Sequence, residues 1–121
     1  MSRTPDQVIS SLNKSYSALY RATEEMNELA TNEAEAERAY KVALAQRMLE
    51  LKADGQSITL IPKLAEGDKL VADLKFKYNV ASEVYRIHRA KINSYKTAVN
   101  KNQSELGIVK AEYQYATAQE G

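Results

Sequence analysis

The 121-residue sequence contains no cysteine and no tryptophan, a single histidine, a single phenylalanine, and few residues that interrupt helices. Without cysteine there is no disulfide, no thiolate nucleophile and no cysteine-based zinc or iron–sulfur site. A lone histidine, His88, excludes a histidine-only metal cage or a two-histidine relay within one chain. Only four glycines and two prolines occur, fewer than average usage gives. This scarcity of helix breakers predicts long helices.

The sequence also lacks an excess of charge of either sign and any long apolar run. Its 17 Lys and Arg residues nearly balance its 16 Asp and Glu residues. This balance argues against binding of nucleic acid or membrane by bulk charge. No stretch approaches the roughly 18 apolar residues of a membrane span, and the first residues do not resemble a secretory leader. We therefore expect a soluble, cytoplasmic protein.

Catalytic motifs are missing as well. The sequence has no glycine-rich phosphate loop, no His-Glu-x-x-His, no Gly-x-Ser-x-Gly and no aspartate-rich calcium loop. We therefore expect a protein that is not an enzyme and that carries no cofactor.

Two long helices, 5–54 and 68–119, are predicted on either side of a connector, 55–67, within a single domain of residues 1–121. Thr4 and Gln7 form a capping box at the start of the first helix. Gly55 is suited to the left-handed position that follows a helix, and Asp68 is the expected N-cap of the second helix.

The second helix has the heptad spacing of a coiled coil. Fourteen positions from Val71 to Ala116 alternate in steps of three and four, and twelve of them are apolar or Tyr. Helices of equal length joined by a short connector favour an antiparallel pair. The predicted fold is an all-α, antiparallel two-helix coiled-coil hairpin that oligomerises into a helical bundle.

The apolar surface of each helix is wider than a two-helix contact requires. We expect the surplus to form an oligomer interface, most simply in an antiparallel homodimer that makes a four-helix bundle. The candidate interface residues are Leu19, Met26, Leu29, Val80, Val84 and Ile87.

Charges are segregated along the chain. Residues 24–37 contain six acids and no base, whereas 75–101 contain seven bases and one acid. In a hairpin folded at 55–67, the numbers of facing residues add to about 122, so the acids face 85–98. This rule predicts a polar layer that fixes the register, formed by Glu33, Glu37, His88 and Arg89. A metal or acid–base site at Glu33, Glu37 and His88 is the weaker alternative.

The basic stretch has two interpretations. It pairs with the acids of the same chain, or it follows the phosphates of a single-stranded nucleic acid while tyrosines stack on the bases. The candidate contacts are Lys75, Lys77, Lys96, Lys101 and Tyr20.

The connector is unusually apolar. We expect Ile58, Leu60, Ile61 and Leu64 to fold back on the end of the hairpin, because apolar side chains favour burial. The alternative is an exposed tip, with Ile58, Leu60 and Ile61 in contact with a partner.

Five short segments carry a resemblance: Ala39–Ala45, Leu51–Gly55, Ser57–Thr59, Ala65–Asp68 and Val71–Phe76. Over roughly residues 38–100 the chain resembles small, mostly uncharacterised helical proteins encoded by tailed bacteriophages and prophages. The resemblance implies a phage accessory protein of the host cytoplasm, linked to DNA recombination or replication. Small phage proteins also include inhibitors of host defence systems, anti-CRISPR proteins among them, which implies binding to a host protein as the alternative.

The predicted function is therefore non-catalytic binding of a macromolecular partner. The partners expected are a second copy of the chain, a phage or host protein, and single-stranded DNA.

Overall fold

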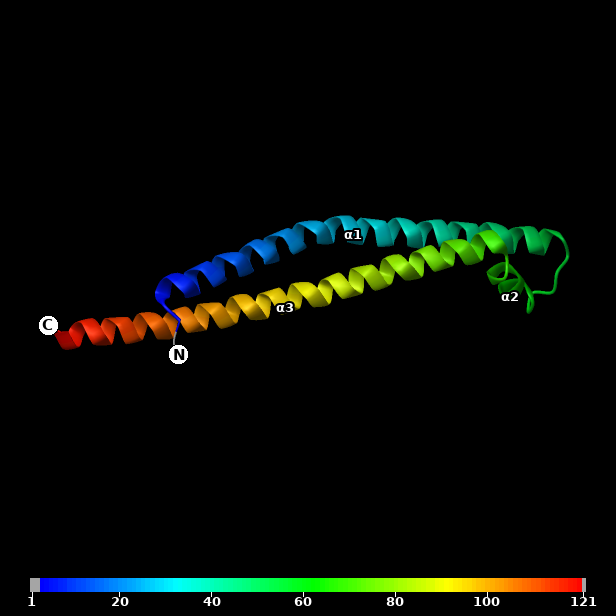
Figure 1. Ribbon diagram of the computed structural model, residues 1–121. Coiled ribbons are helices and arrows are strands. Elements are labelled where there is room, and N and C mark those ends of the chain that lie inside the picture. The colour runs from blue at the N-terminus through cyan, green and yellow to red at the C-terminus, as the bar shows by residue number, and fades with distance from the viewer. Residues whose placement is uncertain (1–2, 121) are drawn as a thin grey trace. The chain divides into compact units, whose positions relative to one another are not determined.

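The computed structural model describes the backbone of residues 3–120 and the side chains of residues 3–118. It contains three helices, α1 (Pro5–Ala53), α2 (Ile61–Glu66) and α3 (Lys69–Glu120), and no strand among the described residues. α1 and α3 lie side by side and antiparallel, as Figure 1 shows. The predicted all-α hairpin is confirmed, and the predicted ends of the two long helices differ from the observed ones by at most one residue.

The observed helix ends carry the caps that the sequence predicts. The backbone N–H of Thr4 donates to Gln7 Oε1 at 2.9 Å, and the N–H of Gln7 donates to Thr4 Oγ1 at 3.2 Å, which completes the capping box. Gly55 has a φ of 83°, the left-handed conformation that favours glycine. The Gly55 and Gln56 N–H groups then bond carbonyls of the last turn of α1, which is the Schellman arrangement. Asp68 caps α3 by accepting from the N–H of Val71 at 3.3 Å.

The described chain divides into two compact units. The terminal unit combines Met1–Glu25 with His88–Gly121, and the turn unit is Met26–Ile87. Each unit contains a part of α1 packed against a part of α3, and only the turn unit contains α2.

The core of the turn unit is formed where α2 packs on the end of α1. Leu51, Ile61 and Ala65 are buried together, with Leu44 and Met48 packed against them. Ile61 is therefore buried as expected. The predicted burial of the other apolar connector residues is wrong, because Ile58, Leu60 and Leu64 are 79%, 51% and 44% exposed. A six-residue helix has one inward face, and Ile61 and Ala65, four residues apart, occupy it.

Polar contacts hold α2 between α1 and α3. The Tyr40 hydroxyl donates to Glu66 Oε1 at 2.5 Å, and Lys75 Nζ lies 3.4 Å from Glu66 Oε2. The Tyr40 ring also stacks on Tyr78, with 6.2 Å between ring centroids. Just beyond the same end of α2, Arg47 Nε lies 3.5 Å from the carboxylate of Asp68. These contacts set the position of α2 and the local register of α1 against α3.

The predicted seam of α3 is confirmed over Val71–Val109. Val71, His88, Ile92, Val99 and Val109 are buried, and the remaining seam positions in this range are half-buried. The last two seam positions, Tyr113 and Ala116, are exposed.

The predicted register is wrong, although the direction of the hairpin is right. The rule that facing numbers add to about 122 places position 44 opposite Tyr78 and position 34 opposite His88. The structure instead stacks Tyr78 on Tyr40 and bonds His88 to Ala22. In the turn unit the cause is α2, because the final turns of α1, from Leu44 to Leu51, pack against α2.

We expect Ile61→Ala to lower the free energy of unfolding by about 2–5 kcal/mol, because it opens a cavity beneath α2. The matched control is Ile58→Ala, which removes the same atoms from an exposed side chain three residues away. The control should stay within about 0.5 kcal/mol of the parent chain. Urea unfolding followed by circular dichroism measures both changes. Equal effects of the two substitutions would contradict the observed docking of α2.

The Tyr40–Glu66 hydrogen bond predicts a pH dependence of stability. The hydrogen bond from Tyr40 holds the pKa of Glu66 below its ordinary value of 4.5, and Lys75 lowers that pKa further. A carboxyl whose pKa falls on folding stabilises the folded state fully above pH 4.5, and this stabilisation is lost as the pH falls below it.

We therefore expect Tyr40→Phe to cost about 1 kcal/mol at neutral pH. The difference from the parent chain should shrink as Glu66 becomes protonated in acid. Urea titrations at a series of pH values measure the difference. A difference that does not change with pH would contradict the assigned bond.

Candidate nucleic-acid interface

Two segments that carry no acid face each other in the terminal unit. Asn102 Nδ2 donates to Ser15 Oγ at 2.7 Å, and Gln103 donates to the Tyr16 hydroxyl. His88 Nε2 lies 2.6 Å from the carbonyl oxygen of Ala22. These contacts bring residues 15–22 of α1 alongside residues 88–103 of α3, and the acid-free stretches around them are 7–23 and 88–104. We name the pair of segments the basic collar.

The basic collar contains six bases and no Asp or Glu. All six side chains are exposed. They are Lys14, Arg21, Arg89, Lys91, Lys96 and Lys101. Within the described residues of the terminal unit, the ion pairs are Arg3–Glu105 and His88–Glu25, and neither involves these six bases. The collar is thus a concentrated positive region in a chain whose net charge is only +1.

Two acids at the edges of the collar, Glu105 and Glu25, form no ion pair with its six bases within the described residues. Glu105, one turn beyond Lys101, is paired with Arg3. The hydrogen bond from Arg3 is the main reason that the pKa of Glu105 is lowered, and the nearby charge of Lys101 is a smaller one. Glu25 lies 4.0 Å from the imidazole of His88. Both carboxylates therefore lie nearest to groups outside the set of six bases.

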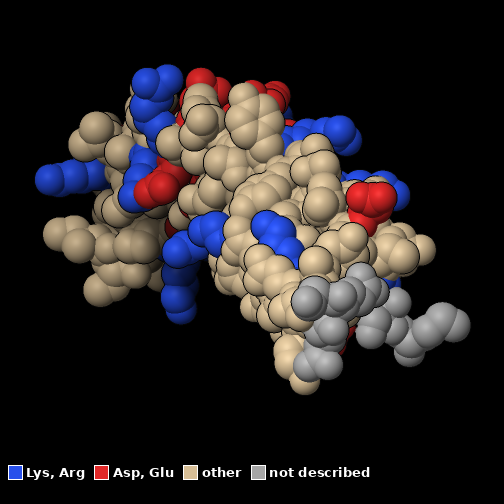
Figure 2. All heavy atoms as spheres, turned by 90° about the vertical axis from the view of Figure 1, so that its left-hand side faces the viewer, with Lys and Arg blue, Asp and Glu red and all other residues tan. Residues whose placement is uncertain are grey.

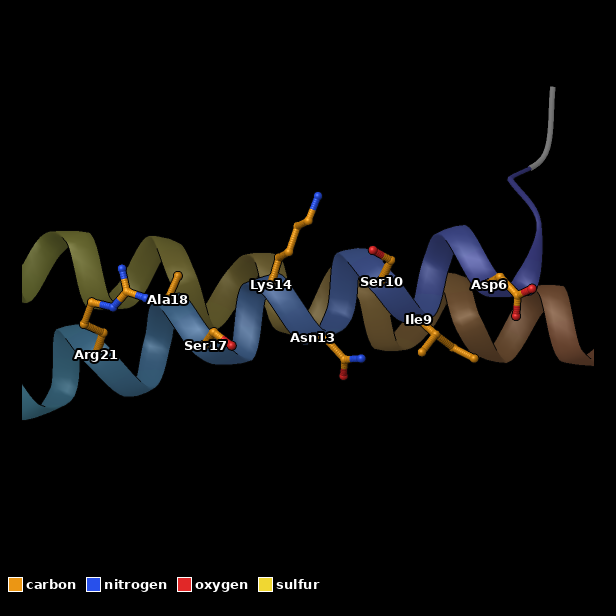
Figure 3. Close-up of a pocket in the computed structure, with 8 residues that line it drawn as sticks. All are labelled: Asp6, Ile9, Ser10, Asn13, Lys14, Ser17, Ala18 and Arg21. Atoms are coloured by element: carbon orange, nitrogen blue, oxygen red, sulfur yellow. The ribbon is translucent and has the colours of Figure 1, made fainter.

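The outer face of α1 within the collar is polar and open. Figure 3 shows residues that line an open groove on α1: the side chain of Lys14 points away from the helix, Arg21 lies further along it, and Asp6, just outside the collar, lines the other end. Ser17 lies between these two bases, Ser10 and Asn13 precede Lys14, and all three side chains offer hydrogen-bonding groups. Such a surface can bind phosphate oxygens through both charge and hydrogen bonds.

Two tyrosines lie beside this groove. Tyr16 and Tyr20 are four residues apart on α1 and are 44% and 68% exposed. They line a second shallow groove together with Ser17, Arg21 and Glu24. An exposed ring beside arginine is a platform on which an unpaired base can stack.

Lys and Arg side chains are visible at several places on the face of the molecule that Figure 2 shows. Exposed bases of this kind attract an anionic polymer through their electrostatic potential and do not require a pocket of matching shape.

The structure separates the predicted nucleic-acid contacts into two groups. Lys96, Lys101 and Tyr20 lie in the basic collar, whereas Lys75 and Lys77 lie in the turn unit. Lys75 is partly neutralised by Glu66, and its ammonium lies 6.0 Å from the centroid of the Tyr40 ring.

Sequence reasoning missed two members of the collar, Lys14 and Arg21. The longest run of bases lies in the second helix, whereas these two bases lie in the first. A search for acid-free stretches in both helices would have found them, since 7–23 contains bases and no acid.

The four residues of the predicted polar layer fall in different units: Glu33 and Glu37 lie in the turn unit, and His88 and Arg89 lie in the terminal unit. His88 is buried and bonds Ala22, and the carbonyl can only accept, so the imidazole Nε2 carries the hydrogen. Glu37 pairs with Lys41 on its own helix at 2.6 Å, and Arg89 is exposed. No group of three or more His, Asp or Glu residues that could hold a metal occurs among the described residues.

The predicted oligomer interface also divides into two groups. Leu19, Met26 and Leu29 are half-buried, whereas Val80, Val84 and Ile87 are 46%, 42% and 58% exposed. Only the second group therefore presents a largely uncovered surface.

The turn unit contains an apolar groove at its tip. The groove lies between the end of α1 and the start of α2, and its lining includes Met48, Leu49, Ile58, Ile61 and Pro62. Leu49 and Ile58 are 68% and 79% exposed. The groove is suited to an apolar side chain of another protein.

Comparison of the chain with family models, with curated proteins and with solved structures gave no match. Among the described residues, no helix combines the length and apolar character that crossing a membrane requires.

Proposed function

We propose that the protein is a non-catalytic accessory protein that binds single-stranded nucleic acid through the basic collar. The observation that carries the proposal is the exclusion of acids from both facing segments, which leaves six exposed bases free of ion pairs within the described part of the terminal unit. Binding to such a surface releases counterions from the nucleic acid and therefore weakens as salt rises.

The exposed tyrosines favour single strands over duplex. Tyr20 is 68% exposed and lies in the same groove as Arg21. Unpaired bases can stack on a ring, whereas the bases of a duplex are already stacked. A role in DNA recombination or replication, in a phage or prophage, is the setting that we propose for this binding.

We expect Lys96→Glu combined with Lys101→Glu to weaken binding of a single-stranded oligonucleotide. The magnitude of the slope of log K against log salt should fall by about 0.7 for each phosphate that the variant no longer neutralises. Fluorescence anisotropy over a salt series measures this slope.

The control is Lys52→Glu combined with Lys63→Glu, which makes the same change in net charge on exposed lysines of the turn unit. The control should keep the parent slope. Equal weakening in both variants, or no binding by the parent chain at low salt, would contradict the proposal. Tyr20→Ala should cost about 1–3 kcal/mol with single strands and leave binding of duplex unchanged.

A second candidate function is binding of a host protein, as an inhibitor of host defence would require. The apolar groove at the tip favours this function, because Leu49 and Ile58 are large, exposed side chains that line it.

We expect Ile58→Asp to abolish capture of such a protein from nuclease-treated bacterial lysate, with nucleic-acid binding unchanged. The matched control is Ile108→Asp, which alters an exposed isoleucine of the terminal unit. Capture that survives Ile58→Asp would rule out the tip as the docking site.

A further inference from the structure

A shallow groove on α1 combines two aromatic rings with one base and one acid. Its lining residues are Tyr16, Ser17, Tyr20, Arg21 and Glu24, and we name this lining the tyrosine groove. Ser17 and Arg21 also line the open groove of Figure 3, so the two grooves are neighbours on the helix. Phosphate binding and base stacking account for Arg21 and Tyr20. They do not account for Glu24, whose negative charge repels phosphate.

The two rings of the tyrosine groove differ in how α3 restrains them. The hydroxyl of Tyr16 accepts a hydrogen bond from Gln103 of α3, and this tyrosine is 44% exposed. Tyr20, four residues further along α1, is 68% exposed. The Tyr20 ring therefore offers an accessible surface on which a base can stack, next to a ring whose position α3 holds.

The charged groups of the groove, Arg21 and Glu24, are exposed and form no ion pair in the described part of the chain. They are three residues apart, and the same spacing and order occur at Arg47 and Glu50, which do pair, at 2.9 Å. The Arg21 guanidinium can only donate hydrogen bonds, and the Glu24 carboxylate can only accept them. A ligand that engages both groups must therefore present acceptors and donors side by side.

We propose that the tyrosine groove binds a guanine base of the single strand that the basic collar holds, an inference that rests on the proposed function. Tyr20 stacks on the face of the base. Arg21 donates to guanine O6 and N7, the commonest specific contact of arginine with a base. Glu24 accepts from N1–H and from the N2 amino group, which follow O6 along the same edge and match the two oxygens of a carboxylate.

The other bases match Arg21 and Glu24 less well. Thymine and uracil carry one N–H donor between two carbonyl oxygens, and those oxygens repel a carboxylate. Cytosine and adenine each carry an amino group next to an acceptor nitrogen, so only one carboxylate oxygen finds a donor. Guanine alone presents two adjacent donors for the Glu24 carboxylate together with two acceptors for Arg21.

Fluorescence anisotropy of the full chain with labelled single strands tests the proposal. The probes are a short oligothymidine and the same strand with one central guanine, adenine or hypoxanthine, the last being guanine without its N2 amino group. We expect the guanine strand to bind at least about fivefold more tightly than oligothymidine. The hypoxanthine strand should fall between the two, because it offers Glu24 one donor instead of two.

Glu24→Gln should abolish the preference for guanine, because the amide presents one acceptor oxygen and turns a donor toward the second donor of the base. Oligothymidine should bind this variant at least as tightly as the parent chain, because a charge that repels phosphate is removed. The matched control is Glu28→Gln, which removes the same charge from an exposed side chain outside the lining of the groove. The control should keep the full preference for guanine.

Equal affinity for all the strands would overturn the guanine assignment and leave salt-dependent binding by the collar intact. A preference that survives Glu24→Gln, or that Glu28→Gln also removes, would overturn the assignment as well. Competition by free guanosine monophosphate at the concentration of the strand would show a mononucleotide site, which contradicts binding of a base within a strand. Failure of every strand to bind would overturn the proposed function together with this inference.

Discussion

The packing of an apolar seam of α3 against α1 is the interaction on which the rest of the structure depends. Neither helix has a core of its own, and a long helix in water is stabilised mainly by the apolar face that it buries. Val8 and Ala22 of α1 are buried in the terminal unit, as are Ile92 and Val99 of α3. Two polar side chains, His88 and Asn102, occupy the same seam and bond α1. Polar groups at seam positions lower stability but restrict the register, because any other alignment leaves them without partners.

The seam also explains why charge can be distributed so unevenly. Because packing and polar seam residues hold the helices together, the bases of the collar are not needed for ion pairs in the hairpin. Exposed ion pairs contribute little to stability in any case. In the sequence, the separate acidic and basic stretches suggested that acids and bases of the same chain pair with each other. In the structure, the bases of the collar instead form an exposed charged surface. It makes one region strongly positive in a chain whose total charge is near zero.

Sequence patterns predicted the elements well because each signal was local. The capping box at Thr4, the left-handed Gly55 and the N-cap at Asp68 each involve residues within one turn. The register could not be predicted in the same way, because it depends on how α2 packs under the last turns of α1. Of the candidate contacts, Lys96, Lys101 and Tyr20 lie in the collar. Lys14 and Arg21 lie in an acid-free stretch that the sequence contains, but only the structure shows that this stretch lies beside α3.

The register of the terminal unit is the most direct test of the account, because the seam and the collar both depend on it. Disulfide trapping in the cysteine-free chain can measure it. Cysteines at Ser15 and Asn102, whose side chains are hydrogen-bonded at 2.7 Å, should form an intramolecular disulfide. Cysteines at Tyr20 and Asn102 match the alignment expected from sequence and should not. Trapping of the second pair in preference to the first would contradict the structure and the collar built on it.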